Sequence, residues 1–191
     1  MADPRPSWDE YFLLLAKLAA CRSTCLSRPT GAVIVVQKHV VATGYNGSMP
    51  GVAHCTDEGE CYRRKIKGVD EDLKHDVCRA IHAEANALAH AARLGIPVLD
   101  GTVYCTLQPC YVCVKLMASA GIRRAVYETK YESPDQVRDR LWRRALQEAG
   151  IQFQQLGLSE PTKELALRLI REETSPRRLA SPGQPSLTFG G

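Results

Sequence analysis

The residues His82-Ala83-Glu84, followed further along the chain by Pro109-Cys110-Tyr111-Val112-Cys113, decide how this sequence folds. The histidine and the two cysteines can supply three ligands to one zinc ion and leave its fourth position to water. An open position is typical of a catalytic zinc site, because a structural site closes all four. The glutamate can lie beside that water without binding the metal. We therefore expect a catalytic zinc centre, held by His82, Cys110 and Cys113, with Glu84 as a neighbouring carboxylate.

Both halves of this pattern lie where the sequence predicts the start of a helix. Pro109 suits the turn before a helix, and no helix breaker follows until Gly121, which suits a helix end. His82 likewise precedes an alanine-rich run that ends at Gly95. The positive ends of the two helix dipoles favour thiolate cysteines and hydroxide on a bound metal. Two buried helices with chance polar residues would not explain this spacing.

A Cys-x-x-Cys pair alone could also be a redox pair or half of a structural zinc ribbon. His-x-Glu together with Pro-Cys-x-x-Cys is instead the documented signature of zinc-dependent nucleobase deaminases. In that chemistry we expect Glu84 to move protons from the attacking water to the ring nitrogen and to the departing amino group. A carboxylate does this well when a dry pocket raises its pKa.

The length and composition predict one domain, residues 1–174, with a sizeable core. The 25 basic and 21 acidic residues give a net charge of +4, which does not favour a nucleic-acid partner but suits a phosphorylated substrate. No apolar run is long enough to span a membrane and no secretory signal is recognisable, so we expect a cytoplasmic protein. Residues 175–191, rich in Pro, Gly and Ser, are expected to be a disordered tail.

The rest of the sequence alternates between helical and strand patterns. An aromatic stripe between Trp8 and Ala19 predicts an N-terminal helix whose stripe faces the core. Helices and strands in this order predict a mixed five-stranded sheet with helices on both faces, an α/β fold of three layers, α/β/α. The expected strands are 32–36 and 40–43, which form a hairpin, then 102–106, 124–127 and 151–156. One further helix is expected to start at Ser133-Pro134-Asp135-Gln136, and a last helix to cover 162–173.

Residues 46–80 show no clear helix or strand pattern, and a loop of that length inside a compact domain needs a staple. Four thiolates could close a structural zinc site, in which a nearby histidine could replace one cysteine. The alternative is unpaired thiols in an irregular loop. The cysteines are Cys25, Cys55, Cys61 and Cys78, and the histidines are His54 and His75.

The chain resembles the deoxycytidylate (dCMP) deaminase family over roughly residues 8 to 160. The zinc motifs are shared by the whole cytidine-deaminase-like superfamily. The segments Gly44-Tyr45-Asn46-Gly47 and Arg22-Ser23-Thr24-Cys25 narrow the resemblance to the dCMP branch, and Trp8–Phe12 and Gly31–Val35 extend it. The resemblance implies the cytidine deaminase-like fold and zinc-dependent hydrolysis of dCMP to dUMP and ammonia, which feeds thymidylate synthesis.

The resemblance also implies roles for individual residues. Asn46 would hydrogen-bond the sugar, although an Asn-Gly pair is also an ordinary turn former. The backbone N–H of Ala83, at the start of a helix, would bind a carbonyl of the base. Candidates for contact with the phosphate are Arg22 and Ser23, with Arg28 and Lys115 as alternatives.

The resemblance implies a regulated homo-oligomer, often a hexamer, that dCTP activates and dTTP inhibits. Gly44 to Gly47 would take part in the regulatory site, and some family members carry a second, structural zinc in the region of the long loop. Other interpretations are a deaminase of another cytosine or adenine nucleotide, a tRNA adenosine deaminase, and a non-catalytic relative used for regulation or DNA uptake. The mild charge and the 6% aromatic content disfavour a nucleic-acid partner, and Glu84 disfavours a non-catalytic protein.

Overall fold

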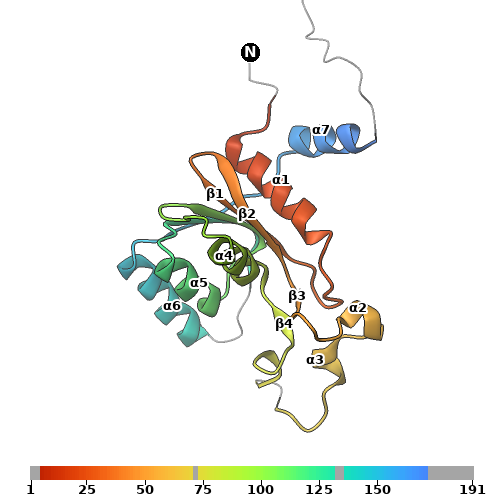
Figure 1. The fold of residues 1–191 in the computed structure, drawn as a ribbon. Coiled ribbons are helices and arrows are strands. Elements are labelled where there is room, and N and C mark those ends of the chain that lie inside the picture. The colour runs from red at the N-terminus through yellow and green to blue at the C-terminus, as the bar shows by residue number, and fades with distance from the viewer. Residues whose placement is uncertain (1–4, 71–72, 132–135, 172–191) are drawn as a thin grey trace, which may run out of the picture.

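The computed structural model describes residues 5–70, 73–131 and 136–171. Its centre is the predicted mixed five-stranded sheet, in the order β2-β1-β5-β6-β7 (Figure 1). β1 is antiparallel to both of its neighbours, β2 and β5, whereas β5, β6 and β7 are parallel to one another. The strands are β1 (Gly31–Val36), β2 (His39–Tyr45), β5 (Thr102–Leu107), β6 (Arg124–Thr129) and β7 (Gln152–Gln155).

The predicted hairpin forms between β1 and β2. Its turn consists of Gln37 and Lys38, whose φ angles of 49° and 64° are both left-handed, as the tightest hairpin turns require. The strands extend slightly beyond their predicted bounds, because Gly31 pairs with Tyr45. β1 is buried along nearly its whole length, so it forms the middle of the core.

Helices cover both faces of the sheet, which confirms the predicted three layers (Figure 1). α1 (Trp8–Ala20) packs on one face, and α4 (Ala83–Arg93) and α5 (Tyr111–Ser119) lie on the other. Successive strand residues alternate between the two layers, since Val33 packs with Phe12 whereas Ile34 packs with Ala87 and Met117. The starts of α4 and α5 therefore lie together on one face of the sheet.

Two glycines allow the helices to approach the sheet at backbone distance. A Cβ atom added to Gly31 would lie 2.1 Å from the carbonyl oxygen of Ala16, in α1. A Cβ atom added to Gly44 would lie 2.1 Å from the carbonyl oxygen of Ala83, in α4. No side chain fits at either distance, so these positions fix the two helices against β1 and β2.

The predicted core-facing stripe of the N-terminal helix is wrong in part. Phe12, Leu13 and Ala16 are buried, but Trp8 and Tyr11 are 54% and 44% exposed. The close approach of Ala16 to the sheet decides which face turns inward, and this contact with β1 cannot be read from helical spacing alone. The helix start is well defined, because Ser7 and Glu10 form a capping box.

The C-terminal helices are α6 (Gln136–Glu148) and α7 (Glu160–Ile170). α6 ends before Gly150, as predicted, and most of its predicted capped start, Ser133-Pro134-Asp135, lies outside the described residues. α7 begins earlier than predicted: Ser159 occupies the N-cap position, and the first turn that follows contains a proline, which suits such a position. Its predicted end near Glu173 and the predicted disordered tail 175–191 also lie outside the described residues, and no helix among those described is long and apolar enough to cross a membrane.

Glu10 connects the two ends of the fold. Its carboxylate accepts hydrogen bonds from the Ser159 backbone N–H at 2.9 Å and from the Thr162 hydroxyl at 3.0 Å. The hydrogen bonds from Ser159 lower the pKa of Glu10 to about 2. α1 and the start of α7 are thus held together by one carboxylate.

Residues 46–80 contain more regular structure than predicted, and they extend away from the five-stranded sheet (Figure 1). β3 (Gly47–Ser48) pairs with β4 (Ala80–Ile81), so the segment leaves and rejoins the fold at neighbouring points. Between these two strands, the described residues form three helices, each too short to be revealed by hydrophobic periodicity. These are α2 (Cys55–Glu58), α3 (Tyr62–Lys65) and the 3₁₀ helix η1 (Leu73–His75).

Candidate active site

The three predicted zinc ligands come together at two helix starts. His82 is the N-cap of α4, Cys110 is the N-cap of α5, and Cys113 lies in the first turn of α5. His82 Nδ1 lies 3.4 Å from Cys110 Sγ and 3.5 Å from Cys113 Sγ. A nitrogen and a sulfur bound tetrahedrally to zinc would lie roughly 3.6 Å apart, so the donor set fits that metal. Among the described residues, no other group of three His, Cys, Asp or Glu side chains is arranged for a metal in this way.

One of the two thiols in this group, that of Cys110, is set up for deprotonation. A hydrogen bond from the Cys113 thiol, helped by the His82 ring, lowers the pKa of Cys110 to about 4. The same hydrogen bond raises the pKa of Cys113, because Cys113 is the donor that keeps its proton. A divalent cation bound between the two sulfurs would take the place of that shared proton.

Glu84 is the carboxylate of the site and lies in the first turn of α4. It is only 4% exposed, and it does not belong to the metal-binding group. Burial raises the pKa of Glu84 to about 7. The side chain can therefore both accept and deliver a proton near neutral pH, which is what a general acid–base catalyst needs.

Asn46 is buried, and its side chain joins two connecting segments. Its Oδ1 accepts hydrogen bonds from the Thr30 backbone N–H at 2.8 Å and from the Ser23 hydroxyl at 2.6 Å. Its Nδ2 donates to the Arg28 carbonyl oxygen at 2.9 Å. Asn46 thus holds the residues before β1 against the end of β2.

The other predicted substrate contacts surround the same end of the sheet. Ala83 is fully buried as the first residue of α4, whereas Arg22 is exposed just beyond α1. Asn86 was not predicted, although its Nδ2 donates to the Tyr45 carbonyl oxygen at 2.8 Å and so ties α4 to the Gly44–Gly47 segment. Its place four residues after His82, on the same helix face, was the available sequence clue.

The four cysteines proposed for a second zinc do not form a metal-binding group of three among the described residues. Cys55 and Cys61 are each 8% exposed, and the Tyr62 backbone N–H donates to Cys55 Sγ at 3.4 Å. Both neighbouring histidines have other partners, since His54 hydrogen-bonds Thr24 Oγ1 at 3.0 Å and His75 contacts Arg63. The other two expected ligands, Cys25 and Cys78, are half-buried. The second zinc therefore stays a prediction.

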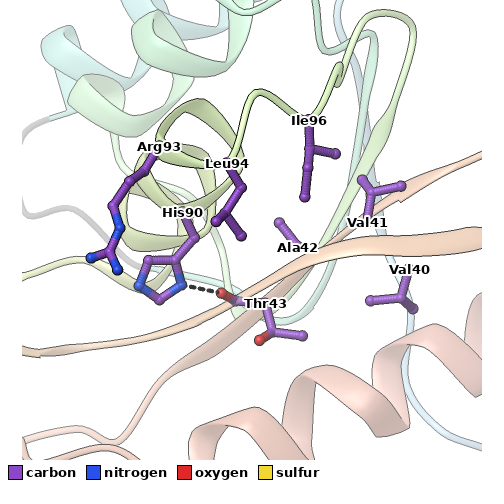
Figure 2. Close-up of a pocket in the computed structure, with 8 residues that line it drawn as sticks. All are labelled: Val40, Val41, Ala42, Thr43, His90, Arg93, Leu94 and Ile96. Atoms are coloured by element: carbon purple, nitrogen blue, oxygen red, sulfur yellow. Dashed lines mark hydrogen bonds between the residues drawn. The ribbon is translucent and has the colours of Figure 1, made fainter.

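A groove of about 420 Å³ lies between β2 and α4, away from the zinc ligands (Figure 2). It is lined by Val40 to Thr43 and by His90, Arg93, Leu94 and Ile96. The His90 ring hydrogen-bonds the Thr43 carbonyl oxygen at 3.1 Å (Figure 2). This groove is at the C-terminal end of α4, whereas His82 is at its start, so it is separate from the candidate active site.

The chain is similar to known proteins both in sequence and in fold. Residues 6–129 match the family described as the cytidine and deoxycytidylate deaminase zinc-binding region. Over 127 residues the chain is 45% identical to the deoxycytidylate deaminase of Mycobacterium phage D29, covering 64% of this chain and 95% of the phage protein. Over 152 residues it is 39% identical to the deoxycytidylate deaminase of Schizosaccharomyces pombe, covering 79% of this chain but only 44% of the yeast protein.

A solved structure supports the same assignment at the level of the fold. The crystal structure of dCMP deaminase from the cyanophage S-TIM5, in complex with dCMP and dUMP, has a TM-score of 0.60 and 24% sequence identity to this chain. The match covers 80% of this chain and 98% of the cyanophage chain. The family match spans residues 6–129, within which the His82, Cys110 and Cys113 group lies. The chain therefore belongs to the family of the cytidine and deoxycytidylate deaminase zinc-binding region.

Proposed function

We propose that this protein deaminates deoxycytidine monophosphate hydrolytically, giving dUMP and ammonia as a step towards thymidylate. The observation that carries the proposal is the buried Glu84 carboxylate beside the His82, Cys110 and Cys113 group. The chain shares 45% identity with a phage protein named deoxycytidylate deaminase, and it spans 95% of that protein. It spans only 44% of the fission yeast relative, so the reaction is supported mainly by the site and by the phage protein.

The site residues divide the chemistry between them. His82, Cys110 and Cys113 would hold a zinc ion, which lowers the pKa of a bound water towards about 7. Glu84 accepts one proton of the attacking water and delivers it to ring N3. It then takes the remaining proton from the new C4 hydroxyl and delivers it to the amino group, so that ammonia leaves and the C4 carbonyl forms. The Ala83 backbone N–H, unpaired within the first turn of α4, can donate to a carbonyl of the base. The positive ends of α4 and α5 favour the negative charge that develops between them.

The substrate class is tested by measuring ammonia release from dCMP, deoxycytidine and dCTP under identical conditions. We expect kcat/KM to be at least about tenfold higher for dCMP, because one well-placed charge-assisted hydrogen bond to a phosphate contributes that much. Equal or better turnover of deoxycytidine or dCTP would contradict the monophosphate assignment. Loss of ammonia release with all three would contradict the deaminase proposal itself.

Replacing Arg22 with alanine is expected to raise the KM for dCMP about tenfold, because a cation that contacts the phosphate is lost. Support for this role is positional, since the neighbouring Ser23 hydrogen-bonds the buried Asn46 at the end of β2. The KM for deoxycytidine, which has no phosphate, should not change. Arg93→Ala is the matched control, because Arg93 is also exposed but lies at the far end of α4. An unchanged KM for dCMP in Arg22→Ala would show that other groups bind the phosphate.

A second zinc ion, held by Cys25, Cys55, Cys61 and Cys78, is a further part of the proposal. The buried thiols of Cys55 and Cys61 and the hydrogen bond from the Tyr62 backbone N–H to Cys55 Sγ support it, because zinc-bound thiolates commonly accept such bonds. His54 and His75 already have partners, which favours cysteines as the ligands.

Replacing Cys61 with serine is expected to reduce the zinc content from two ions per chain to one and to lower thermal stability. A metal site that contributes even about 2 kcal/mol would shift Tm by roughly 4–8 °C in a chain of this size. Elemental analysis and thermal unfolding measure the two effects. Cys21→Ser is the control, because Cys21 is exposed at the end of α1. One zinc per chain in both the wild type and Cys61→Ser would mean that these cysteines are ordinary thiols.

We also propose a homo-oligomer, a hexamer in the form that the resemblance implies, with dCTP as activator and dTTP as inhibitor. Exposed apolar side chains on α5 and α6 support self-association, since Val112, Leu116 and Leu141 are 58%, 46% and 65% exposed. Sedimentation should show the oligomer, and dCTP should make the dCMP saturation curve less sigmoidal. A hyperbolic saturation curve that neither triphosphate changes would contradict regulation through Gly44–Gly47, but it would not contradict the proposed reaction.

The proposed location is the cytoplasm. None of the eight cysteines forms a disulfide bond, which suits a reducing compartment. Fractionation of cells that produce the protein should recover it with cytosolic markers, and recovery with a membrane or secreted fraction would contradict this.

A further inference from the structure

A second pocket lies at the carboxyl ends of β6 and β7, beneath α6. Its volume is about 320 Å³, which is within the range of small-molecule sites. Open α/β sheets bind ligands at the carboxyl ends of their parallel strands, so the pocket lies on the edge of the sheet where a ligand is expected. Neither the zinc-binding group nor Glu84 lines it.

The charged side chains among the described residues that line the pocket are both positive. Lys130 and Arg143 are among its lining residues, and the described residues of the lining include no carboxylate. Tyr127 also lines it; burial raises the pKa of Tyr127, and the positive charge of Arg143 opposes that rise, which places the guanidinium near the phenol. The phenol hydroxyl therefore remains protonated and can act as a hydrogen-bond donor. Two cations and a hydroxyl donor together suit an anion.

Trp142, which also lines the pocket, carries a buried hydrogen-bond donor that lacks a partner among the described residues. Among the described residues, Trp142 Nε1 is the only buried side-chain nitrogen or oxygen without a hydrogen bond. Buried polar groups are almost always paired, so the unpaired indole N–H indicates a missing acceptor. The ring is held in place by an edge-to-face contact with Phe153, with centroids 5.6 Å apart and planes at 86°.

Gln108 connects the pocket to the active site. It lines the pocket and directly precedes Pro109 and the zinc ligand Cys110. Its backbone N–H donates to the Thr129 carbonyl oxygen at 2.8 Å, and its Oε1 accepts from the Tyr131 N–H at 3.1 Å. A ligand in the pocket would therefore contact the segment that positions Cys110.

We propose that this pocket binds the phosphate group of a small molecule, with Arg143 and Lys130 as its counter-charges and the Trp142 indole as a donor. The phosphate can come from the substrate itself or from a separate molecule. The binding claim goes beyond the proposed deaminase activity and does not depend on it.

The binding test uses the fluorescence of Trp142 in the full chain. The sequence contains two tryptophans, so Trp8→Phe leaves Trp142 as the only reporter. Inorganic phosphate and pyrophosphate, titrated at constant ionic strength against chloride, should each give a saturable change. Arg143→Gln and Lys130→Gln should each weaken the response at least about tenfold. Arg144→Gln is the matched control, because Arg144 pairs with Glu148 at 2.8 Å and does not line the pocket.

Steady-state kinetics separate the two sources of the phosphate. If the substrate supplies it, inorganic phosphate competes with dCMP, and Arg143→Gln raises the KM for dCMP but not for deoxycytidine. If a separate molecule supplies it, phosphate binds without competing with dCMP. The proposal is overturned if the fluorescence shows no saturable response, or if Arg143→Gln and Arg144→Gln respond alike. Since fluorescence reports binding without turnover, failure of the deaminase assay would not affect this test.

Discussion

Replacing Glu84 with glutamine is expected to lower the turnover of dCMP by at least about a hundredfold. Glutamine keeps almost the same shape but cannot accept or deliver a proton, and general acid–base catalysis contributes about that factor or more. The zinc content should not change, because Glu84 lies outside the metal-binding group. Turnover and zinc content are measured on the same sample, so a loss of metal cannot imitate the loss of the catalyst.

The same substitution should affect stability in the opposite direction. Burial raises the pKa of Glu84 from 4.5 to about 7 in the folded chain. The folded state therefore binds this proton more tightly than the unfolded state, and the carboxylate destabilises the metal-free fold increasingly as the pH rises from 4.5 to about 7. Glutamine carries no such cost. Metal-free Glu84→Gln should unfold at a higher temperature than the wild type above pH 7 and at a similar temperature near pH 4.

Two comparisons complete this test. Glu164→Gln changes an exposed carboxylate on α7 and should alter neither turnover nor stability. His82→Ala removes a metal ligand and should lose zinc together with activity. Retention of more than about a tenth of the wild-type turnover by Glu84→Gln would exclude the proton-transfer role, and a loss of stability above pH 7 would show that the buried carboxylate supports the fold.

The group of His82, Cys110 and Cys113 could be predicted from the sequence because its geometry is set by short segments. Pro109 and Gly121 mark the ends of one helix, and Gly95 marks the end of the other, so the positions of His82 and Cys110 at helix starts follow from local rules. The hairpin and the remaining strands could also be predicted from the sequence, because short runs rich in β-branched residues are separated by turn residues. Local patterns thus account for the sheet and the zinc ligands.

Features that depend on distant contacts could not be predicted. The buried face of α1 is decided by the approach of Ala16 to Gly31, and the structural role of Asn46 is decided by Ser23 and Thr30. Nothing in the local sequence shows that Trp142 is buried without a hydrogen-bond partner. The same limit applies to Gly44, because the family resemblance implies only a regulatory role for its segment, whereas the structure shows that Gly44 packs directly against α4.

Replacing Gly44 with alanine is expected to destabilise the fold by about 3 kcal/mol or more, because overpacking of this kind costs about 1–3 kcal/mol even where neighbours can move. The new Cβ would lie 2.1 Å from the Ala83 carbonyl oxygen and 2.5 Å from the Ala87 backbone nitrogen, and neither backbone atom can move without the helix. A loss of this size would lower Tm by roughly 6–12 °C in a chain of this length. Thermal unfolding of the zinc-loaded protein measures the shift.

The displaced element is α4, so the substitution should also impair catalysis in the molecules that remain folded. His82 caps this helix and Glu84 lies in its first turn, and a shift of about 1 Å in a catalytic group can reduce turnover about a hundredfold. Gly31→Ala makes an equally close contact, 2.1 Å from the Ala16 carbonyl oxygen, but it displaces α1 on the opposite face. It should lower Tm comparably while sparing more of the turnover per folded molecule.

Gly157→Ala provides the neutral control for both variants, because its Cβ would meet no atom within 4 Å. Its Tm should stay close to that of the wild type. If Gly44→Ala unfolds at the temperature of this control, β2 and α4 are not held at backbone distance. If it is destabilised but keeps full turnover per folded molecule, other contacts hold the start of α4 in place. The first of these to test by mutation is the hydrogen bond from Asn86 Nδ2 to the Tyr45 carbonyl oxygen.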